Sequence, residues 1–106
     1  MKAIAKICLL DPTQSGISKN TGTPWVAKEF VIEVECEDGH RDTMAVRAST
    51  PDTVKVLEGC LKDDIIDVEL GFASRLRTYR RNDGSEGYIR STDVYARNVK
   101  IVEARL

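Results

Sequence analysis

Hydrophobic and polar residues alternate along most of the chain, which is the pattern of β-strands with one buried face. The clearest case is residues 25–36, where one face is apolar: Val26, Phe30, Ile32, Val34 and Cys36. The other face carries Trp25, Ala27 and three glutamates, with Val31 as an apolar exception. After the turn residues Asp38-Gly39, residues 41–48 place Met44, Val46 and Ala48 on a buried face. The pattern therefore predicts a hairpin over residues 25–48.

Three more strands are predicted from the same kind of evidence. Residues 2–10 form an apolar strand that ends at Asp11-Pro12, because proline cannot donate a hydrogen bond to a sheet. The glycine- and serine-containing stretch from Pro12 to Pro24 is predicted to be a loop. Residues 64–81 and 86–103 are long strands separated by Asn82-Asp83-Gly84-Ser85, and Gly71 is a candidate bulge or bend.

One short helix is predicted between the third and fourth of these strands. Ser49-Thr50-Pro51-Asp52 supplies a hydroxyl cap, a proline in the first turn and an acid near the helix start. Val54, Leu57 and Leu61 then follow helical spacing, so we expect a helix over residues 51–61. This order predicts an all-β fold: a five-stranded OB-fold barrel with one short helix between strands 3 and 4. With 106 residues, we expect a single OB-fold domain over residues 1–106.

Composition excludes several classes of protein. No apolar run reaches the roughly 18 residues that a membrane span needs, and the first residues do not resemble a signal peptide. We therefore expect a cytoplasmic protein with no membrane contact. The cysteines Cys8, Cys36 and Cys60 are odd in number and far apart, so buried reduced thiols are favoured over disulfides or a zinc site.

Charge is distributed unevenly although the net charge is only −1. Residues 52–69 contain six acids against two lysines. Residues 75–90 reverse this balance with five arginines: Arg75, Arg77, Arg80, Arg81 and Arg90. The chain therefore has one local cationic element on an acidic body, and such elements are candidate contacts for a polyanion.

Residues suited to catalysis or metal binding do not form a recognisable set. His40 lies in a turn without a partnered cysteine or acid cluster, and we expect it at the surface. The acids Asp63, Asp64 and Asp67 are expected to be solvated, because alternation sends Asp64 and Asp67 to opposite faces. Residues 16–22 contain glycines but lack the ending of a phosphate-binding loop. We therefore predict no catalytic residues, no metal site, no cofactor and no enzyme activity.

The last predicted hairpin resembles that of a known family. Residues 74–79 (Ser-Arg-Leu-Arg-Thr-Tyr), Asp83-Gly84, Tyr88 and Asn98-Val99 are similar to the hairpin of the fourth and fifth strands of bacterial single-stranded-DNA-binding proteins (SSB). The similarity extends over Leu57 to Leu70 and over three earlier segments: Leu10-Asp11-Pro12, residues 22–26 and Phe30. It covers nearly the whole chain, and the order and spacing of its pieces make it specific.

This resemblance implies sequence-independent binding of single-stranded DNA in replication, repair or recombination, by a homodimer or homotetramer. Two features depart from the family. Asp63 stands where a small residue is usual, and the chain ends at Arg105-Leu106 without the acidic tail through which many members recruit other proteins. We therefore expect strand binding without recruitment through such a tail. Ile4 and Cys8 of the first strand, on the face opposite Ile7 and Leu9, are candidates for a subunit interface. Alternatively, both faces of this strand are buried within the barrel.

A binder of single strands needs cations for phosphates and aromatic rings for bases. Arg75, Arg77, Tyr79 and Arg81 alternate, so they share one face, while Leu76 and Thr78 point toward the core. A symmetric two- or four-residue turn pairs Arg81 with Glu86, Tyr79 with Tyr88 and Arg77 with Arg90. These pairings predict a tyrosine pair flanked by an arginine pair. Alternatively, the arginines are simply solvated and the tyrosines pack together.

Trp25 and Arg47 complete the set because both fall on exposed faces of their strands. Tyr95 is expected to pack, and Lys19 and Lys28 to be solvated. The candidate nucleic-acid-binding residues are Trp25, Arg47, Arg75, Arg77, Tyr79, Arg81, Tyr88 and Arg90. Two other hypotheses stay open: an OB-fold protein-interaction module of the primosome-accessory type that docks a replication partner, and RNA binding of the cold-shock type.

Overall fold

The computed structural model describes residues 1–104 of the chain. Arg105 and Leu106, on which the expectation about the missing tail rests, lie outside the described residues. The elements are, in chain order, β1 (Lys2–Leu10), β2 (Gln14–Ile17), β3 (Pro24–Glu35), β4 (Arg41–Ala48), α1 (Pro51–Glu58), β5 (Ile65–Arg80) and β6 (Glu86–Glu103). The predicted strands and their order are confirmed, and β2 is an addition.

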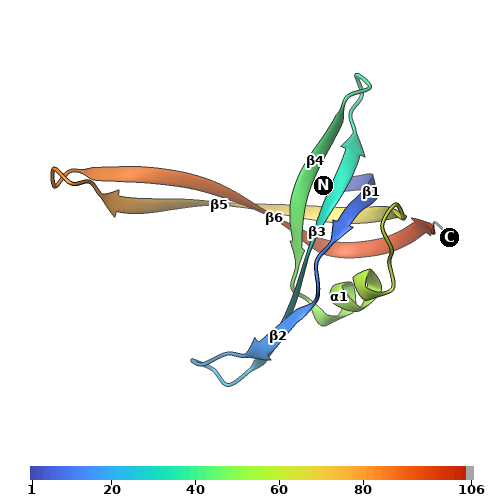
Figure 1. Ribbon diagram of the computed structural model, residues 1–106, viewed down its shortest axis with the longest axis horizontal. Coiled ribbons are helices and arrows are strands. Elements are labelled where there is room, and N and C mark those ends of the chain that lie inside the picture. The colour runs from blue at the N-terminus through green and yellow to red at the C-terminus, as the bar shows by residue number, and fades with distance from the viewer. Residues whose placement is uncertain (105–106) are drawn as a thin grey trace.

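Five of the strands close into a ring. The sheet order is β1-β5-β6-β4-β3-β2, and β1 also pairs with β3, which closes the ring and leaves β2 on the edge of β3. All the pairs are antiparallel except β4 with β6, which meet in parallel at Arg47 and Tyr95. With α1 lying between β4 and β5 in the chain (Figure 1), this is the predicted OB-fold barrel with its helix between the third and fourth barrel strands.

The barrel interior is filled by the alternating apolar residues of its strands. The largest fully buried side chains are Phe30, Ile7, Ile32, Leu57, Ile66, Leu70, Val46, Val54 and Val68. The face predicted for residues 30–32 and 44–48 is therefore the core face, although Met44 is only partly buried. Burial of this apolar surface is the main force that holds the ring together.

Helix α1 packs on β6 and β3 and is shorter than expected. It ends at Glu58, so Leu61 lies outside it and is 62% exposed. Pro51 occupies the start of the helix as predicted, but the hydroxyl of Thr50 does not cap a backbone N–H. That hydroxyl instead donates to the Oγ1 of Thr53 at 2.8 Å.

The segment predicted as a loop between Pro12 and Pro24 contains β2, which pairs with Pro24 to Ala27 of β3. Lys28 follows this pairing and is buried rather than solvated. Its Nζ donates to the backbone carbonyl of Asp11 at 2.7 Å and contacts the Oγ1 of Thr13 at 3.4 Å. The long aliphatic stem lies on the core side of β3, opposite Ala48, so the lysine ties this loop to the barrel.

A bulge at Cys8 changes which residues of β1 face the core. Ile7 pairs with Ile32 and Leu9 pairs with Val31, so Cys8 is the extra residue. The bulge reverses the alternation, and Leu9 is 53% exposed instead of sharing the buried face of Ile7. Ile4 is 56% exposed, so this position of β1 is not buried within the barrel.

The acids before β5 also differ from expectation. Asp64 is buried, not solvated, and its carboxylate accepts a hydrogen bond from the backbone N–H of Leu61 at 2.8 Å. Asp63, the position where the resemblance has a small residue, adopts a φ of 76°. This left-handed conformation is uncommon for residues other than glycine, although aspartate tolerates it better than most.

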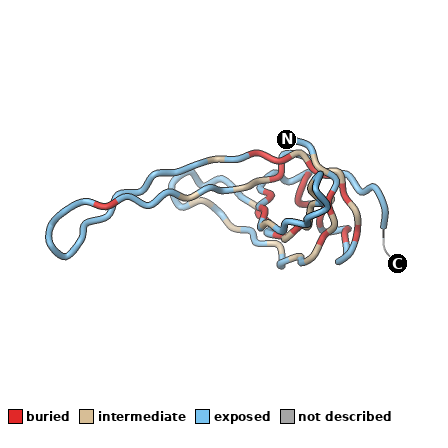
Figure 2. The backbone as a smooth tube through the Cα atoms, turned by 90° about the horizontal axis from the view of Figure 1, so that it is seen from above, coloured by how far each residue is buried: buried red, intermediate tan, exposed pale blue. Residues whose placement is uncertain are grey.

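The β5–β6 hairpin extends well beyond the barrel (Figure 1), and Figure 2 shows it exposed along almost its whole length. Leu76, expected to point toward the core, is 59% exposed. Ile66, Val68 and Leu70, earlier on the same strand and on the same face as Leu76, are buried in the core. No element covers this face where the hairpin extends beyond the barrel. Both faces of the projecting hairpin are therefore available for contacts.

Candidate nucleic-acid interface

The register of the projecting hairpin is set by its turn. The backbone N–H of Arg81 donates to the carbonyl of Ser85 at 2.8 Å, so the loop contains the three residues 82–84. The N–H of Gly84 donates to the carbonyl of Arg81 at 3.0 Å, and Gly84 has a φ of 85°. A three-residue loop with glycine in the left-handed region is a common hairpin connection. It replaces the symmetric two- or four-residue turn that we predicted.

Asp83 stabilises this turn through its carboxylate. Its Oδ1 accepts hydrogen bonds from the hydroxyl of Ser85 at 2.6 Å and from the backbone N–H of Ser85 at 2.9 Å. These bonds favour the charged form and lower the pKa of Asp83, the hydroxyl contributing most. The turn geometry is therefore held by side-chain as well as backbone contacts.

The change of turn shifts every predicted pair by one residue. Tyr79 lies opposite Gly87, Tyr88 opposite Thr78, and Arg90 opposite Leu76. The predicted pairs of Tyr79 with Tyr88, Arg77 with Arg90 and Arg81 with Glu86 are wrong. Because side chains alternate along a strand, a shift of one residue moves Tyr88 and Arg90 to the opposite face of the hairpin.

The hairpin therefore has two distinct faces, which we name by the numbering of their residues. The odd face carries Gly71, Ala73, Arg75, Arg77 and Tyr79 of β5 with Gly87, Ile89, Ser91, Asp93 and Tyr95 of β6. The even face carries Phe72, Ser74, Leu76, Thr78 and Arg80 of β5 with Glu86, Tyr88, Arg90, Thr92 and Val94 of β6. Two tyrosines and two of the predicted arginines share the odd face.

The odd face continues into a hollow between the hairpin and β4. This hollow has a volume of about 700 Å³ and is lined by Arg47, Arg75, Arg77 and Tyr95 among others. Arg47 reaches it because β4 and β6 meet at Arg47 and Tyr95. The tertiary structure therefore brings together three predicted cations from two strands that are far apart in the sequence.

Two of these arginines also contact carboxylates. The Nε of Arg75 lies 3.2 Å from Asp93, and a terminal nitrogen of Arg47 lies 3.5 Å from Glu29. All four side chains are more than half exposed, so each ion pair is weak and exchangeable in water. A phosphate that enters the hollow competes with these carboxylates for the guanidinium groups.

A second, more apolar hollow adjoins the first. It has a volume of about 630 Å³ and is lined by Trp25, Val26, Pro51 and Val54 among others. Ser49, directly after β4, lines both hollows, so they lie on either side of this residue. Trp25 is 43% exposed and places an aromatic ring at the start of β3.

Arg81 directly follows β5 and lies beside Tyr79. Its guanidinium carbon is 5.6 Å from the centre of the Tyr79 ring, within the range of a cation–π contact. A terminal nitrogen donates to the backbone carbonyl of Glu86 at 3.0 Å. No described carboxylate forms an ion pair with Arg81, so its charge is open to a phosphate.

Tyr95 and Arg97 were missed by the sequence analysis as candidates for this surface. Arg97 lies 5.4 Å from the centre of the Tyr95 ring and donates to its hydroxyl at 3.0 Å. This hydrogen bond is the main reason that the pKa of Arg97 is raised, with Glu69 adding a smaller effect. The spacing Tyr-x-Arg occurs at residues 79–81, 88–90 and 95–97, after every tyrosine of the chain, so this pattern could not single out Tyr95.

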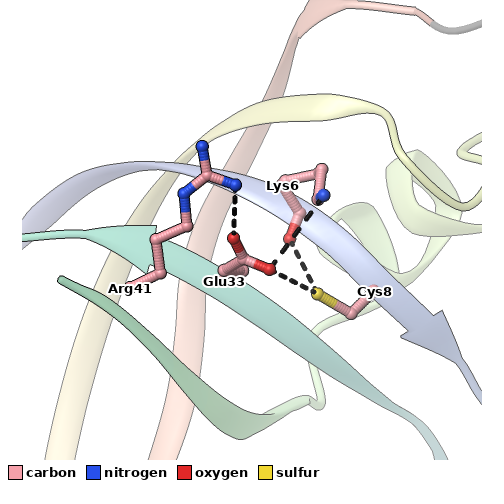
Figure 3. Close-up of polar contacts among 4 residues, drawn as sticks. All are labelled: Lys6, Cys8, Glu33 and Arg41. Carbon is pink, nitrogen blue, oxygen red and sulfur yellow. Dashed lines mark hydrogen bonds and ion pairs between the residues drawn. The ribbon is translucent and has the colours of Figure 1, made fainter. Parts of the chain in front are cut away.

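Other charged groups lie away from this surface. Glu33 accepts a hydrogen bond from Arg41 at 3.1 Å and lies 4.0 Å from Lys6, with the Cys8 sulfur close by (Figure 3). These contacts join β1, β3 and β4, and the cluster holds two cations around one carboxylate. His40 is exposed in its turn, as predicted, 2.7 Å from Asp38. Of the predicted buried thiols only Cys60 is fully buried, and all three cysteines are free.

The range of residues 1–104 contains no group of three or more His, Cys, Asp or Glu side chains that could hold a metal ion. None of its helices is long and apolar enough to cross a membrane.

Comparison with solved structures identifies similar folds. The crystal structure of the mitochondrial single-stranded DNA binding protein Rim1 from S. cerevisiae matches with a TM-score of 0.66 and 16% sequence identity, over 99% of this chain and 95% of that one. The selenomethionine-labelled form of Rim1 matches with a TM-score of 0.64, also at 16% identity. No protein-family model matches the sequence, and no curated protein matches it. The similarity in structure confirms the OB-fold.

Proposed function

We propose that this protein binds single-stranded DNA without sequence preference. The observation that carries the proposal is the composition of one region of the surface: Arg75 and Arg77, which share the odd face with Tyr79, line the hollow that contains Arg47. Ser49 borders both this hollow and the one that contains Trp25. Alternating cations and rings are what a sequence-tolerant binder of single strands needs. The similarity in fold to a protein named as a single-stranded DNA binding protein is consistent with this reading.

The roles divide by chemistry. Arg47, Arg75, Arg77 and Arg81 neutralise phosphates, while Trp25 and Tyr79 stack on bases. Tyr88 and Arg90 lie on the even face, so they contact only a strand that passes around the hairpin. The chemistry is binding alone, with no bond made or broken. Replication, repair or recombination is the expected setting, because each exposes single strands.

Titration with oligo-dT tests the proposal through the fluorescence of Trp25, the only tryptophan in the chain. We expect quenching that saturates, and an affinity that falls with salt by about 0.7 units of log–log slope for each neutralised phosphate. A Trp25→Phe variant followed by fluorescence anisotropy of labelled DNA is the matched control. Absence of saturable binding at low salt, or binding independent of salt, would overturn the proposal.

A protein-interaction module is the second candidate function. It is favoured by the apolar side chains exposed on the even face, since Leu76 and Tyr88 are 59% and 62% exposed. Uncovered apolar patches of this kind mark contact surfaces. In that case oligo-dT would not bind, and Leu76→Glu would abolish capture of a purified replication partner. RNA binding is addressed by competition between dT and rU oligomers of equal length.

We also propose a homodimer or homotetramer, with β1 at the subunit interface. Ile4 is 56% exposed on β1, which leaves apolar surface uncovered in a single chain. Light scattering over a range of concentrations tests this, with Ile4→Glu expected to dissociate the assembly. The cytoplasmic location stays a prediction, which cell fractionation would check.

A further inference from the structure

Three glycines in the strands lie directly opposite aromatic residues. Gly16 of β2 pairs with Trp25, Gly71 of β5 pairs with Tyr95, and Gly87 of β6 pairs with Tyr79. The other glycines have different places: Gly22, Gly39 and Gly84 have positive φ, and Gly59 follows the helix. Each glycine within a described strand is thus opposite a ring.

In each pair the ring occupies the space that a side chain on the glycine would fill. A Cβ on Gly87 would overlap the ring of Tyr79, and one on Gly71 would overlap the ring of Tyr95. A Cβ on Gly16 would lie 2.9 Å from Cζ2 of Trp25, closer than real Cβ contacts allow. The rings therefore lie across the main chain of the neighbouring strand.

This arrangement prepares a ring for stacking. Glycine weakens a strand because it has no side chain to pack, and an aromatic ring laid over it recovers that contact. One side of the ring is then supported by the backbone, and the side chain has already lost much of its rotational freedom. When a base stacks on the outer side, the free-energy cost of ordering the ring is therefore smaller.

The three rings lie along the surface already described. Tyr79 and Tyr95 share the odd face, with Arg75 and Arg77 between them, and Tyr95 lines the hollow that has Ser49 in common with the Trp25 hollow. Tyr79 and Tyr95 each have an arginine two residues later within 5.6 Å of the ring centre. Tyr88, which lies on the even face, faces Thr78 and has no glycine opposite.

We infer that Trp25, Tyr95 and Tyr79 are three base-stacking platforms, which makes Tyr95 an additional nucleic-acid contact. Gly16, Gly71 and Gly87 are the positioning residues that seat these rings. The inference rests on the proposed function and names the residues through which bases bind. At Tyr79 and Tyr95 the seated ring has an arginine beside it. There, the ring holds the base of a nucleotide and the arginine holds its phosphate.

The seating itself is tested without DNA. Protons beneath the face of an aromatic ring resonate upfield, so the Hα protons of Gly71 and Gly87 should show this shift in the free protein. Tyr95→Leu should remove it from Gly71 alone, and Tyr79→Leu from Gly87 alone. Ordinary Hα shifts for both glycines in the intact protein would overturn the seating and the inference with it.

Binding tests use two oligonucleotides of equal length, oligo-dT and an abasic strand that keeps the phosphates but has no bases. Gly71→Ala and Gly87→Ala should each weaken oligo-dT binding on the order of 5-fold, since a displaced ring loses about 1 kcal/mol of stacking. Abasic binding and the salt slope should stay unchanged. Gly59→Ala is the control, because its Cβ would come no closer than 3.5 Å to the Val56 carbonyl oxygen.

Tyr95→Leu is the second variant, because it keeps the glycine and does not depend on how Gly71→Ala folds. It should weaken oligo-dT binding by about 5-fold or more and leave abasic binding unchanged. If the intact protein binds oligo-dT but these variants bind it equally well, the platform inference is wrong and the proposed function stands. If the intact protein binds neither strand, the proposed function itself is wrong, and the platform inference that rests on it is wrong too.

Discussion

Tyr88 lies opposite Thr78 across the β5–β6 ladder, so its side chain is on the even face of the hairpin, while Tyr79 is on the odd face opposite Gly87. The two tyrosines are close along the ribbon but cannot bind the same base stack from one side. Arg75 and Arg77 of the odd face line the hollow that contains Arg47, whereas Tyr88 and Arg90 of the even face do not. This relationship separates residues that the sequence alone had grouped together.

Substituting the two tyrosines should therefore have unequal effects. Tyr79→Ala is expected to weaken oligo-dT binding by about 1–3 kcal/mol, because one base loses its stacking partner. Tyr88→Ala should change the affinity by less than about 0.5 kcal/mol, as is usual for surface positions away from a contact. Fluorescence anisotropy of labelled oligo-dT measures both. Equal losses would mean that the strand wraps both faces.

Salt dependence distinguishes the arginines in the same way. Arg77→Gln should reduce the log–log salt slope by about 0.7, because one phosphate contact is lost. Arg90→Gln removes the same charge from the even face, and we expect the slope to stay the same. Titrations at several salt concentrations supply both slopes. A similar reduction in the two variants would point to non-specific attraction by net charge.

Removing the carboxylate that faces Arg75 should strengthen binding. Asp93 lies 3.2 Å from the Arg75 guanidinium and competes with an incoming phosphate. Asp93→Asn is expected to improve the affinity for oligo-dT by about 0.2–1 kcal/mol, the usual size of an exposed ion pair. Glu103→Gln, far along β6, provides a charge-matched control. Weaker binding by Asp93→Asn would show that Asp93 positions Arg75 instead of competing for it.

Lys28 should contribute to stability through its buried ammonium group. Lys28→Met keeps the aliphatic stem but removes the hydrogen bond to the Asp11 carbonyl at 2.7 Å. We expect the free energy of unfolding to fall by about 1–3 kcal/mol, the cost of leaving a buried polar group without its partner. Urea denaturation measures the change. The exposed Lys62→Met should be nearly neutral, and an equal effect of the two substitutions would rule out a special role for Lys28.

The hairpin turn should loosen in acid. Hydrogen bonds from the Ser85 hydroxyl and N–H lower the pKa of Asp83 below its ordinary value of 3.8. Because the folded pKa is depressed, the contribution of Asp83 is complete above this ordinary value and is lost as pH falls through the lower, folded pKa. The amide resonance of Ser85 should titrate with a midpoint below 3.8, and Asp83→Asn should abolish this transition. A midpoint at or above 3.8 would contradict the hydrogen bonds.

The sequence was sufficient for the secondary structure of the barrel because the evidence for each strand is local. Alternation over residues 25–36 identifies a core face that Phe30 and Ile32 do occupy. The Pro51 start and the Asp38-Gly39 turn depend only on backbone preferences of neighbouring residues. These local features, taken in order, were enough to predict a five-stranded barrel with one helix.

Register and burial at the candidate site were decided by the tertiary structure. A hydrophobic pattern fixes the register of a hairpin only where one face is buried, and both faces of this hairpin are exposed. The turn at Gly84 decides the register instead, and with it the separation of Tyr88 from Tyr79. The burial of Lys28 and the meeting of Arg47 with Tyr95 likewise depend on strands distant in the chain. Local sequence therefore determined which strands form, while long-range pairing determined which side chains share a surface.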